Sequence, residues 1–298
     1  MFLTIITPSF NRGYCLENIY NSLLTKNRSN YEWILIDDGS ADNTETLAKK
    51  WIEKNEINFK YIKRANGGKT NALVTAFESS ILGEYSLVLD SDDFLVSNFY
   101  EIIKAEISKM KDNQIGISFL KSDLNGNIIG SEFKKTEVDY AEMYYGAEKT
   151  IGDKMFVVRT DVYAKSLVSS FPNEKLIPES VFYINMSKNG QFKCVNKIIY
   201  KGDYLADGLS FDVEKLAARN INGFVFEKLL LQKEKLSTID MIKNEIKYIS
   251  YSLSAGKSIL KILNESNSKI WSVLLLIPSY LLTWKRIKSI KMIRNGKK

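Results

Sequence analysis

The strongest constraint on the fold of this chain is the alternation of short apolar runs with amphipathic segments over its first hundred residues. Four apolar runs stand out, and they span Phe2–Thr7, Trp33–Ile36, Phe59–Ile62 and Tyr85–Leu89. In the segments between them, apolar side chains recur three and four residues apart, which is the spacing of one helix face. Strands that alternate with helices of this length predict right-handed βαβ units and a largely parallel sheet.

A polar cluster follows each of the four predicted strands. The clusters are Pro8–Arg12, Asp37–Ser40, Ala65–Lys69 and Asp90–Asp93. The carboxyl ends of parallel strands lie along one edge of a sheet, and open α/β sheets bind their ligands beyond that edge. The four clusters therefore predict a single ligand site.

The second half of the chain has a looser pattern. The short strands predicted there span 115–120, 156–159 and 197–200. From residue 211 the chain has a helical pattern, and a core-facing stripe is predicted at Ile239, Ile242, Ile246, Ile249 and Leu253. We expect an α/β domain over 1–210, with a nucleotide-binding half (1–110) and an acceptor half (111–210), followed by a helical C-terminal extension over 211–298.

The chain of 298 residues contains no histidine, which restricts its chemistry more than any other count. Ser-His-Asp and Cys-His catalysis are excluded, as are His-ligated zinc sites. A general base must then be Asp, Glu, Lys, Tyr or Cys, and a metal site made of oxygens suits Mg²⁺, Mn²⁺ or Ca²⁺. The two cysteines, Cys15 and Cys194, cannot form a disulfide framework or a four-ligand zinc site by themselves, so we expect buried thiols in a reducing compartment.

The net charge of +7 lies in the C-terminal tail. Residues 285–298 contain seven Lys or Arg and no acid, so the first 284 residues hold 35 basic and 35 acidic side chains (42 − 7 and 35 − 0). A nucleic-acid binder spreads its cations over a face of the folded domain, so we expect no nucleic-acid partner. The N-terminus has no basic region or cleavage site before its first strand, and we expect a cytoplasmic protein.

The cluster Asp90-Ser91-Asp92-Asp93 is the strongest candidate for a metal site. Three carboxylates within four residues repel one another, and a divalent cation removes that repulsion. The alternating spacing lets Asp90 and Asp92 point to the same side of an extended loop. The alternative is a solvated turn or a helix cap, which suits Asp93 best.

Two other clusters have features of nucleotide binding, although each has a simpler interpretation as a turn. In Asp37–Ser40, a carboxylate at the sheet edge is a good acceptor for the imide N–H of a uracil-like base. In Asn66–Lys69, two glycines leave backbone N–H groups open at a helix start, and Lys69 adds a positive charge, which suits a diphosphate. The signals of dinucleotide redox enzymes and P-loop ATPases are absent from the sequence.

Three motifs in residues 1–100 resemble, in order and spacing, those of inverting family-2 glycosyltransferases of the bacterial cell-surface polysaccharide type. They are Thr7–Arg12, Ile36–Thr44 and Leu89–Asp93. The resemblance implies a GT-A fold, that is, a Rossmann-like and mostly parallel sheet flanked by helices. Three later stretches resemble a bacterial branch of the family more weakly, namely Phe171-Pro172, Pro178-Glu179-Ser180 and Tyr204–Ser210.

The resemblance also implies roles for individual residues. Pro8, Phe10 and Asn11 would line the nucleoside pocket, with Arg12 nearby. Asp38 would hydrogen-bond the base, and Asp90 would approach the ribose or the metal. Asp92 would bind the Mn²⁺ or Mg²⁺ that bridges the diphosphate, so the expected metal ligands are Asp90 and Asp92. With the glycine-rich turn included, the expected nucleotide-binding residues are Pro8, Phe10, Asn11, Arg12, Asp38, Asn66, Lys69, Asp90 and Ser91.

The base of this family commonly lies in a Glu-Asp pair, and the corresponding residues here are Glu179-Ser180. Glu179 is therefore the expected catalytic base, with Asp153 and Asp207 as alternatives. It would deprotonate an acceptor hydroxyl that attacks the anomeric carbon from the opposite face, which inverts it. Pro178 and Phe182 would partly bury Glu179 and raise its pKa toward that of a working base.

The C-terminal segment Ile270–Trp284 is mostly apolar and leads directly into the basic tail. At 15 residues it is shorter than the 20 or so that span a bilayer. Aromatic residues beside Lys and Arg suit a helix that lies on an anionic leaflet, so we expect 270–298 to bind the inner face of the cell membrane. The alternative is a last helix that packs on the domain and ends in a frayed tail.

These features predict a metal-dependent inverting glycosyltransferase. It would move a sugar from a nucleotide-sugar, with a UDP-sugar favoured, to a glycan or lipid-linked acceptor in cell-surface polysaccharide synthesis. One alternative is a non-catalytic module of the same fold that binds nucleotide-sugars or glycans. Another is a glycoside hydrolase with paired carboxylates, which would need neither metal nor nucleotide.

Overall fold

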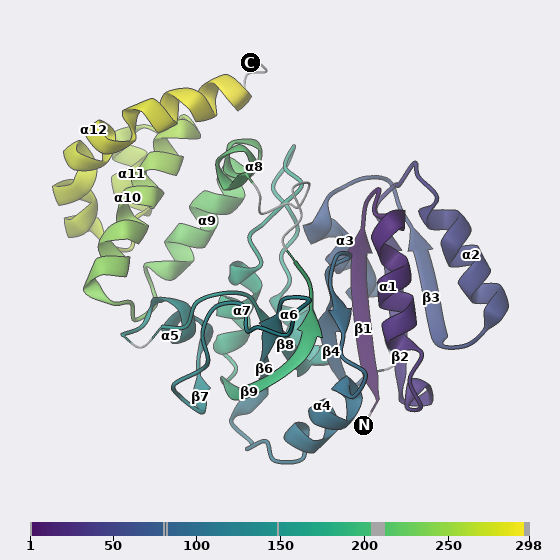
Figure 1. Cartoon of the computed structure of the whole chain (residues 1–298). Coiled ribbons are helices and arrows are strands. Elements are labelled where there is room, and N and C mark those ends of the chain that lie inside the picture. The colour runs from purple at the N-terminus through teal and green to yellow at the C-terminus, as the bar shows by residue number, and fades with distance from the viewer. Residues whose placement is uncertain (1, 80, 82, 148, 204–211, 295–298) are drawn as a thin grey trace. The chain divides into compact units, whose positions relative to one another are not determined.

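The computed structural model describes residues 2–79, 81, 83–147, 149–203 and 212–294, and the chain folds into two compact units (Figure 1). The first unit comprises Met1–Tyr140, Thr150–Val168 and Asn185–Tyr204. The second comprises Ala141–Lys149, Ser169–Ile184 and Leu205–Lys298. The chain thus enters the second unit twice before residue 205. The domain boundaries at 110/111 and 210/211 stay predictions.

The first unit is built on one sheet in which strand order is β3-β2-β1-β4-β8-β6-β9-β5, with β7 beside β9. Its N-terminal strands are β1 (Leu3–Ser9), β2 (Tyr31–Asp37), β3 (Asn58–Lys63) and β4 (Tyr85–Val88). All three pairings among them are parallel, as the alternating pattern predicted. Their carboxyl ends therefore lie along one edge of the sheet, which brings the four polar clusters to that edge.

The rest of the sheet is mixed, which the sequence pattern did not predict. Its strands are β5 (Phe94–Leu95), β6 (Gln114–Ser122), β7 (Glu137–Val138), β8 (Lys154–Arg159) and β9 (Gln191–Lys201). Strand β8 runs antiparallel between β4 and β6, whereas β9 is parallel to β6. The α/β fold class is confirmed, and the mostly parallel character is confined to the N-terminal half.

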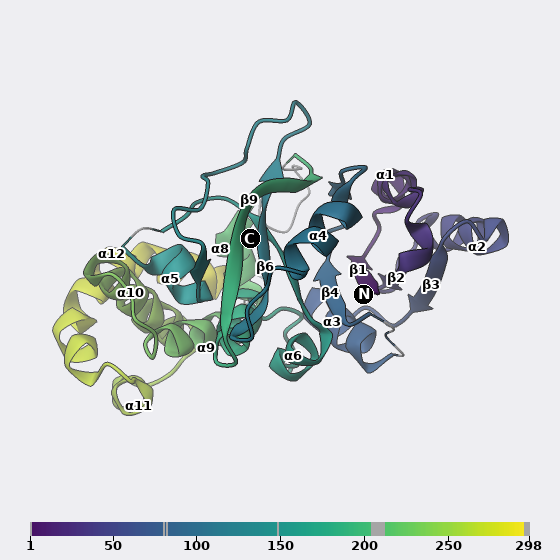
Figure 2. The same ribbon diagram turned by 90° about the horizontal axis from the view of Figure 1, so that it is seen from below.

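Helices cover both faces of this sheet. They are α1 (Gly13–Leu23), the 3₁₀ turn η1 (Arg28–Asn30), α2 (Thr44–Lys54), α3 (Lys69–Glu78), α4 (Phe99–Ile107) and α6 (Thr160–Ser166). Successive residues of a strand point to opposite faces, so each buried strand supplies two cores. On the face of α1 and α2, Trp33 packs against Trp51 and Phe59 at ring distances of 5.4 and 4.7 Å. Figure 2 shows α1 and α2 on one side of β1 and β2 and α3 on the other.

The second unit is helical. Its helices are α8 (Val213–Arg219), α9 (Ile221–Leu231), α10 (Thr238–Ser254), α11 (Ile259–Glu265) and α12 (Lys269–Arg294), together with most of α5 (Tyr140–Tyr145) and the start of α7 (Ser180–Ser187). Phe224, Tyr248, Tyr251 and Ile262 contribute to its core. Among the helices that the structure describes, none has a stretch long and apolar enough to cross a bilayer.

The predicted core-facing stripe of α10 is only partly right. Ile249 is fully buried, but Ile239 at the start of the helix is 65% exposed. The buried face instead carries Asn244, Glu245 and Tyr248, and each of these side chains makes a hydrogen bond inside the unit. Periodicity of apolar residues misses such a face because it counts hydrogen-bonded polar side chains as exposed.

A buried carboxylate joins α4 to β9. Glu106 is 6% exposed, and its two oxygens lie 2.8 Å from Lys193 Nζ, 2.9 Å from Lys197 Nζ and 3.1 Å from Lys109 Nζ. Hydrogen bonds from Lys193, set against the cost of burial, lower the pKa of Glu106 to about 2. The charged form of Glu106 is therefore favoured in the folded state.

We expect Glu106→Gln to lower the free energy of unfolding by about 1–3 kcal/mol at pH 7, because three lysines lose their shared carboxylate. Since the pKa of Glu106 falls on folding, its contribution is complete above the ordinary value near 4.5 and is lost as the pH drops toward 2. Urea unfolding at several pH values should show a constant deficit from pH 8 to 5 that narrows below about 4.5. Asp161→Asn removes an exposed partner of Lys165 and is the control, with an expected change below about 0.5 kcal/mol. An equal loss of unfolding free energy in Glu106→Gln and Asp161→Asn would contradict a stabilising role for the buried Glu106 carboxylate.

Candidate active site

The polar cluster at the end of β1 (Pro8–Arg12) is hydrogen-bonded to the segment at the end of β2 that includes Ser40 and Ala41. Asn11 has a left-handed backbone (φ 53°), and its N–H donates to Ser40 Oγ at 2.9 Å. Its side-chain oxygen accepts from the N–H of Ala41 at 2.8 Å. Pro8 is buried within β1, whereas Phe10 is 48% exposed. The turn therefore presents an aromatic ring at the edge of the sheet while the asparagine fixes its backbone.

Arg12 and Asp42 complete this corner. The Arg12 guanidinium lies 5.8 Å from the centre of the Tyr14 ring and donates to the Tyr14 hydroxyl. The Asp42 carboxylate accepts from the N–H of Gly13 at 2.8 Å, and from the N–H and hydroxyl of Thr44. Burial raises the pKa of Asp42, but these hydrogen bonds outweigh it and hold the pKa below its usual value. Asp42 thus joins the starts of α1 and α2 rather than capping α2 alone.

The buried carboxylate of Asp38 joins the cluster after β2 (Asp37–Ser40) to the cluster after β3 (Ala65–Lys69) through hydrogen bonds. Its oxygens accept from the N–H of Gly67 at 3.0 Å, from the N–H of Gly68 at 2.6 Å and from the Arg64 guanidinium. Asn66, which is exposed, donates from its side chain to the Asp38 carbonyl at 2.9 Å. The glycine N–H groups were expected to be open to a diphosphate. That expectation is corrected, because the anion they bind is Asp38.

An ion pair joins the cluster after β3 (Ala65–Lys69) to the acidic loop after β4 (Asp90–Asp93). Lys69, the first residue of α3, places its ammonium 2.5 Å from Asp90 Oδ1. The Lys69 side chain is 15% exposed and the Asp90 side chain 48% exposed. The sequence predicted both residues for the same site, and the structure brings them into contact. The charge of Lys69 offsets part of the repulsion within the acidic loop.

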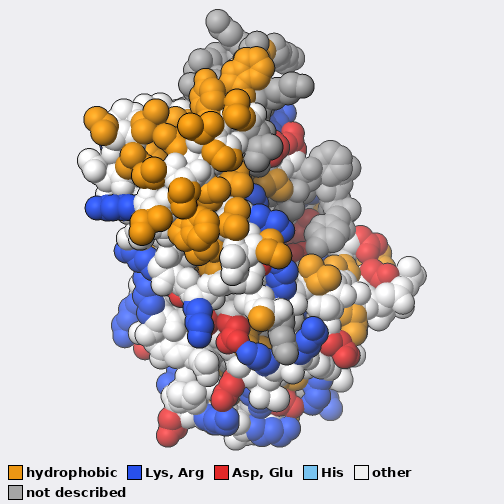
Figure 3. Space-filling view, turned by 90° about the vertical axis from the view of Figure 1, so that its left-hand side faces the viewer, with side chains coloured by type: hydrophobic (Ala, Val, Ile, Leu, Met, Phe, Trp, Pro, Cys, Tyr) orange, Lys and Arg blue, Asp and Glu red, His pale blue; other side chains and the backbone are white. Residues whose placement is uncertain are grey.

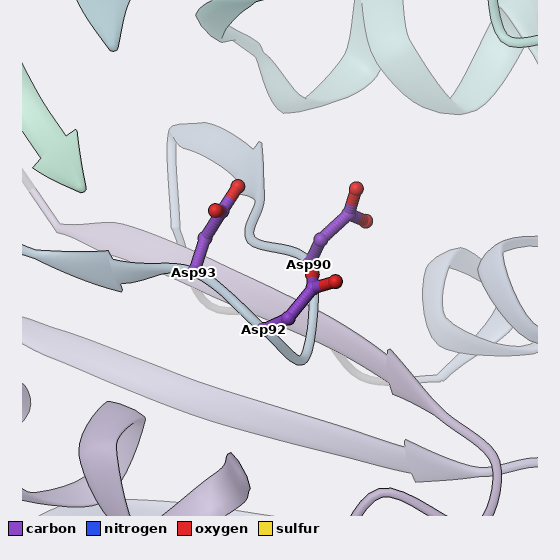
Figure 4. A group of neighbouring side chains, drawn as sticks. All are labelled: Asp90, Asp92 and Asp93. Carbon is purple, nitrogen blue, oxygen red and sulfur yellow. The ribbon is translucent and has the colours of Figure 1, made fainter. Parts of the chain in front are cut away.

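The acidic loop after β4 gathers three carboxylates (Figure 4). One oxygen from each of Asp90, Asp92 and Asp93 lies within 4.8 Å of the others, with Asp93 buried and the other two partly exposed. Two oxygens on one Mg²⁺, Mn²⁺ or Ca²⁺ are at most about 4–5 Å apart, which is twice a metal–oxygen bond of about 2.0–2.6 Å. The loop therefore fits a hard divalent cation. Ser91 lies between its ligand candidates and is partly exposed.

Asp93 has surroundings of its own, which the sequence did not reveal. Its oxygen lies 2.8 Å from the ammonium of Lys121, and both side chains are buried. Burial raises the pKa of Asp93 to about 7, against the attraction of Lys121. A Cβ at Gly202 would stand 1.8 Å from the same oxygen, so this position has room only for glycine while Asp93 stays in place.

Lys121 also lies 3.9 Å from a carboxylate oxygen of Asp153, the alternative base in this unit. The sequence offered one signal for Lys121, a lysine that directly follows the buried run 115–120, and none for Gly202. Sequence reasoning missed both because their partners are distant along the chain.

The expected catalytic base belongs to the second unit. Glu179 directly precedes α7, is partly exposed, and its carbonyl accepts from the N–H groups of Phe182 at 2.9 Å and Tyr183 at 3.2 Å. Phe182 is fully buried and Pro178 partly so. The other alternative base, Asp207, and the motif around it at 204–210 lie outside the described residues.

Comparisons with known proteins identify the fold and the family of the chain. The crystal structure of Staphylococcus aureus TarS 1–349 in complex with UDP-GlcNAc has the same fold, with a TM-score of 0.58 at 16% identity over 100% of this chain and 93% of that one. The poly(ribitol-phosphate) beta-N-acetylglucosaminyltransferase TarP of the same organism is 27% identical over 236 residues, 68% of this chain and 72% of TarP.

A second relative is WfgD of Escherichia coli, a UDP-Glc:alpha-D-GlcNAc-diphosphoundecaprenol beta-1,3-glucosyltransferase. It is 24% identical over 257 residues, 85% of this chain and 91% of WfgD. The family model described as "Glycosyl transferase family 2" matches residues 4–167, which is more than half of the chain. The chain therefore belongs to glycosyl transferase family 2, and it is a glycosyltransferase with a GT-A type of α/β fold.

Proposed function

We propose that this enzyme transfers a sugar from a UDP-sugar to a glycan or lipid-linked acceptor, with inversion and with a divalent metal, in cell-surface polysaccharide synthesis. The observation that carries the proposal is the series of contacts along one sheet edge, which ends in the three carboxylates of the acidic loop. The names of the relatives support it, since TarS was crystallised with UDP-GlcNAc and WfgD is named for a UDP-Glc donor.

For the nucleotide, we assign binding to Pro8, Phe10, Asn11, Arg12, Asp38, Asn66, Lys69, Asp90 and Ser91. The exposed ring of Phe10 offers a surface on which a base can stack. Asp38 differs from the others, because its carboxylate already accepts three N–H groups from residues 64–68. Its contribution is then to shape the turn beside the nucleoside.

For the metal, we assign Asp90 and Asp92 as ligands of Mn²⁺ or Mg²⁺, with Asp93 within reach as a third carboxylate. When bound, such an ion stabilises the negative charge that develops on the departing diphosphate. Lys69 adds a positive charge at the same edge, and its ion pair neutralises Asp90. Its flexible stem lets Lys69 move from Asp90 to a phosphate oxygen.

For the base, we assign Glu179, which would take the proton of the attacking acceptor hydroxyl. Glu179 is partly exposed and directly precedes α7, and a carboxylate held at a fixed place can act as a general base. Asp153 is the alternative, since it lies in the unit of the acidic loop and Lys121 connects it with Asp93.

For the acceptor, we propose a lipid-linked glycan at the inner face of the cell membrane, where the enzyme is held peripherally by residues 270–298. Helix α12 packs Ser272 and Ser279 inward, and both are fully buried. Its opposite face is apolar and exposed, with positions i, i+3, i+4, i+7, i+11 and i+14 occupied by Ile270, Val273, Leu274, Ile277, Leu281 and Trp284 at 52–76% exposure.

Positions at this spacing form one stripe along a helix, and Figure 3 shows hydrophobic side chains gathered over this part of the second unit. Five cations follow within α12 itself, at Lys285, Arg286, Lys288, Lys291 and Arg294. An apolar stripe that is followed along the helix by cationic residues matches an anionic lipid surface. The lipid-linked acceptor in the name of WfgD supports this location.

The metal assignment predicts that UDP, UDP-GlcNAc and UDP-glucose raise the Tm of the wild type more in Mn²⁺ than in EDTA, since a ligand of the native state stabilises it. In Asp92→Asn the metal-dependent part of the shift should vanish and turnover should be lost, because a hard cation loses an anionic ligand. Asp161→Asn, an exposed aspartate on α6, is the matched control and should behave as the wild type. Equal shifts with and without metal in the wild type would refute the assignment.

The base assignment predicts that Glu179→Gln lowers kcat by about 10²–10⁴-fold and leaves UDP affinity within about twofold, since only the proton acceptor is removed. Kinetics of UDP release and calorimetry of UDP binding measure the two quantities. Asp153→Asn should retain most of the turnover. If Glu179→Gln keeps normal kcat, the base is another carboxylate, and a loss in Asp153→Asn would identify it.

The membrane assignment predicts that Ile277→Glu with Leu281→Glu weakens binding to vesicles containing anionic lipid by more than about tenfold, because two apolar side chains, each contributing about 1.5–3 kcal/mol on full burial, are lost. The wild type should float with anionic vesicles, less so at high salt, and bind neutral vesicles weakly. Ile239→Glu alters an equally exposed isoleucine outside α12 and should float as the wild type does. Flotation that is the same for all three proteins would show that α12 is only the end of the fold.

A further inference from the structure

The segment that carries Glu179 is attached to α9 at several points, all within the second unit. Asn220, next to the first residue of α9, accepts on its side-chain oxygen from the N–H groups of Lys175 and Leu176, both at 2.9 Å. In return, the Glu174 carboxylate accepts from the N–H of Asn222 at 2.8 Å and the N–H of Gly223 at 3.0 Å. These reciprocal bonds use the segment to satisfy two of the N–H groups that the first turn of α9 leaves without a partner in the helix, those of Asn222 and Gly223.

Close packing reinforces the attachment. A Cβ at Gly223 would lie 2.7 Å from the Leu176 carbonyl oxygen, so the segment lies directly on the backbone of α9. The rings of Phe171 and Phe226 meet edge to face at 6.0 Å. The path of residues 171–177 is therefore fixed by α9.

The last attachment is at Ser180, the residue after Glu179. Its hydroxyl donates to Glu227 Oε1 at 2.7 Å, and the other oxygen of Glu227 lies 2.6 Å from the ammonium of Lys228. Ser180, Glu227 and Lys228 are all at least nine-tenths buried. A buried carboxylate that loses a partner is strongly destabilised, so Glu227 holds Ser180 in place.

The first turn of α7 ties this bond to Glu179. The carbonyl of Glu179 accepts from the N–H groups of Phe182 and Tyr183, and the carbonyl of Pro178 accepts from the N–H of Val181 at 2.9 Å. Glu179 is thus the last residue before a turn whose first side chain is bonded to α9. Loosening the bond at Ser180 allows this turn to shift, and the Glu179 carboxylate shifts with it.

We propose that Glu227 is a positioning residue for the reaction: through Ser180 it fixes the first turn of α7 and thereby the place of the Glu179 carboxylate. This inference rests on the proposed role of Glu179 as the base. Glu227 itself contacts Ser180 and Lys228 and is buried, so it acts through them. A displacement of about 1 Å in a reacting group can cost about 10²-fold in rate, which sets the size of the expected effect.

The chain offers a matched control within the same unit. Ser272 of α12 donates to Glu245 of α10 at 2.5 Å, and both residues are fully buried or nearly so. This second pair has the same chemistry, but neither of its side chains is hydrogen-bonded to the 171–180 segment in the part of the chain that the structure describes. Comparing the two pairs separates the loss of a buried Ser–Glu bond from the loss of position at Glu179.

The test compares Ser180→Ala and Glu227→Gln with Ser272→Ala and Glu245→Gln in the full-length protein. UDP release is measured from whichever of UDP-GlcNAc and UDP-glucose the wild type turns over, with Mn²⁺, and UDP binding is measured by calorimetry. We expect kcat to fall by about 10–100-fold in the first pair with the Kd for UDP unchanged within about twofold. Ser180→Thr keeps the hydroxyl and should restore most of the kcat. The control pair should keep kcat even where its Tm falls.

Hydrogen exchange gives a readout that does not depend on activity. Amides 181–183 should exchange about tenfold faster in Ser180→Ala and Glu227→Gln, and unchanged in the control pair. Unchanged exchange in the first pair, or equal loss of kcat in both pairs, would overturn the inference. If Glu179→Gln retains turnover, the proposed base is wrong, whereas an inactive Glu179→Gln beside a fully active Glu227→Gln rejects the positioning role alone.

Discussion

The buried Asp38 carboxylate is the interaction on which the sheet edge at the carboxyl ends of β1–β4 depends. A carboxylate taken out of water is tolerated only when hydrogen bonds replace its hydration, and here residues 64–68 supply them. The turn before α3 is thereby drawn onto the end of β2. Because α3 begins at Lys69, the same contact sets the position from which Lys69 reaches Asp90. A substitution at Asp38 would therefore also alter the contact between Lys69 and Asp90 in the loop after β4.

Positive side chains accompany the acidic loop on both sides. Lys69 pairs with Asp90, and the buried Lys121 pairs with Asp93, so two of three adjacent carboxylates are already compensated. Asp92 stands between them and is partly exposed. Lysines that lie so close offset the repulsion among the carboxylates and hold the loop together.

Polar contacts help to organise the helical unit alongside its apolar core. The Ser180–Glu227 and Ser272–Glu245 bonds each join two segments through a buried carboxylate. Such bonds have strict distance and angle requirements, whereas apolar packing tolerates small slides between helices. They therefore suit places where position matters, such as the segment before α7. Helix α12 differs, because one of its faces is an apolar stripe that remains exposed in the folded unit and is therefore accessible to another surface.

The sequence by itself determined the α/β class, the strands β1–β4, the absence of histidine chemistry and the four polar clusters at the carboxyl ends of those strands. These depend on local signals, namely the two periodicities of strand and helix and the position of polar residues at strand ends. The tertiary structure decided how β8 pairs between β4 and β6 and which residues contact Asp38 and Asp93. It also decided the polar core face of α10 and the Ser180–Glu227 bond. Each joins residues 26 or more positions apart, or places a polar group where its partner lies on another element. A hydrogen bond between distant residues leaves no periodic trace in the sequence, because only the folded chain brings donor and acceptor within 3 Å or so.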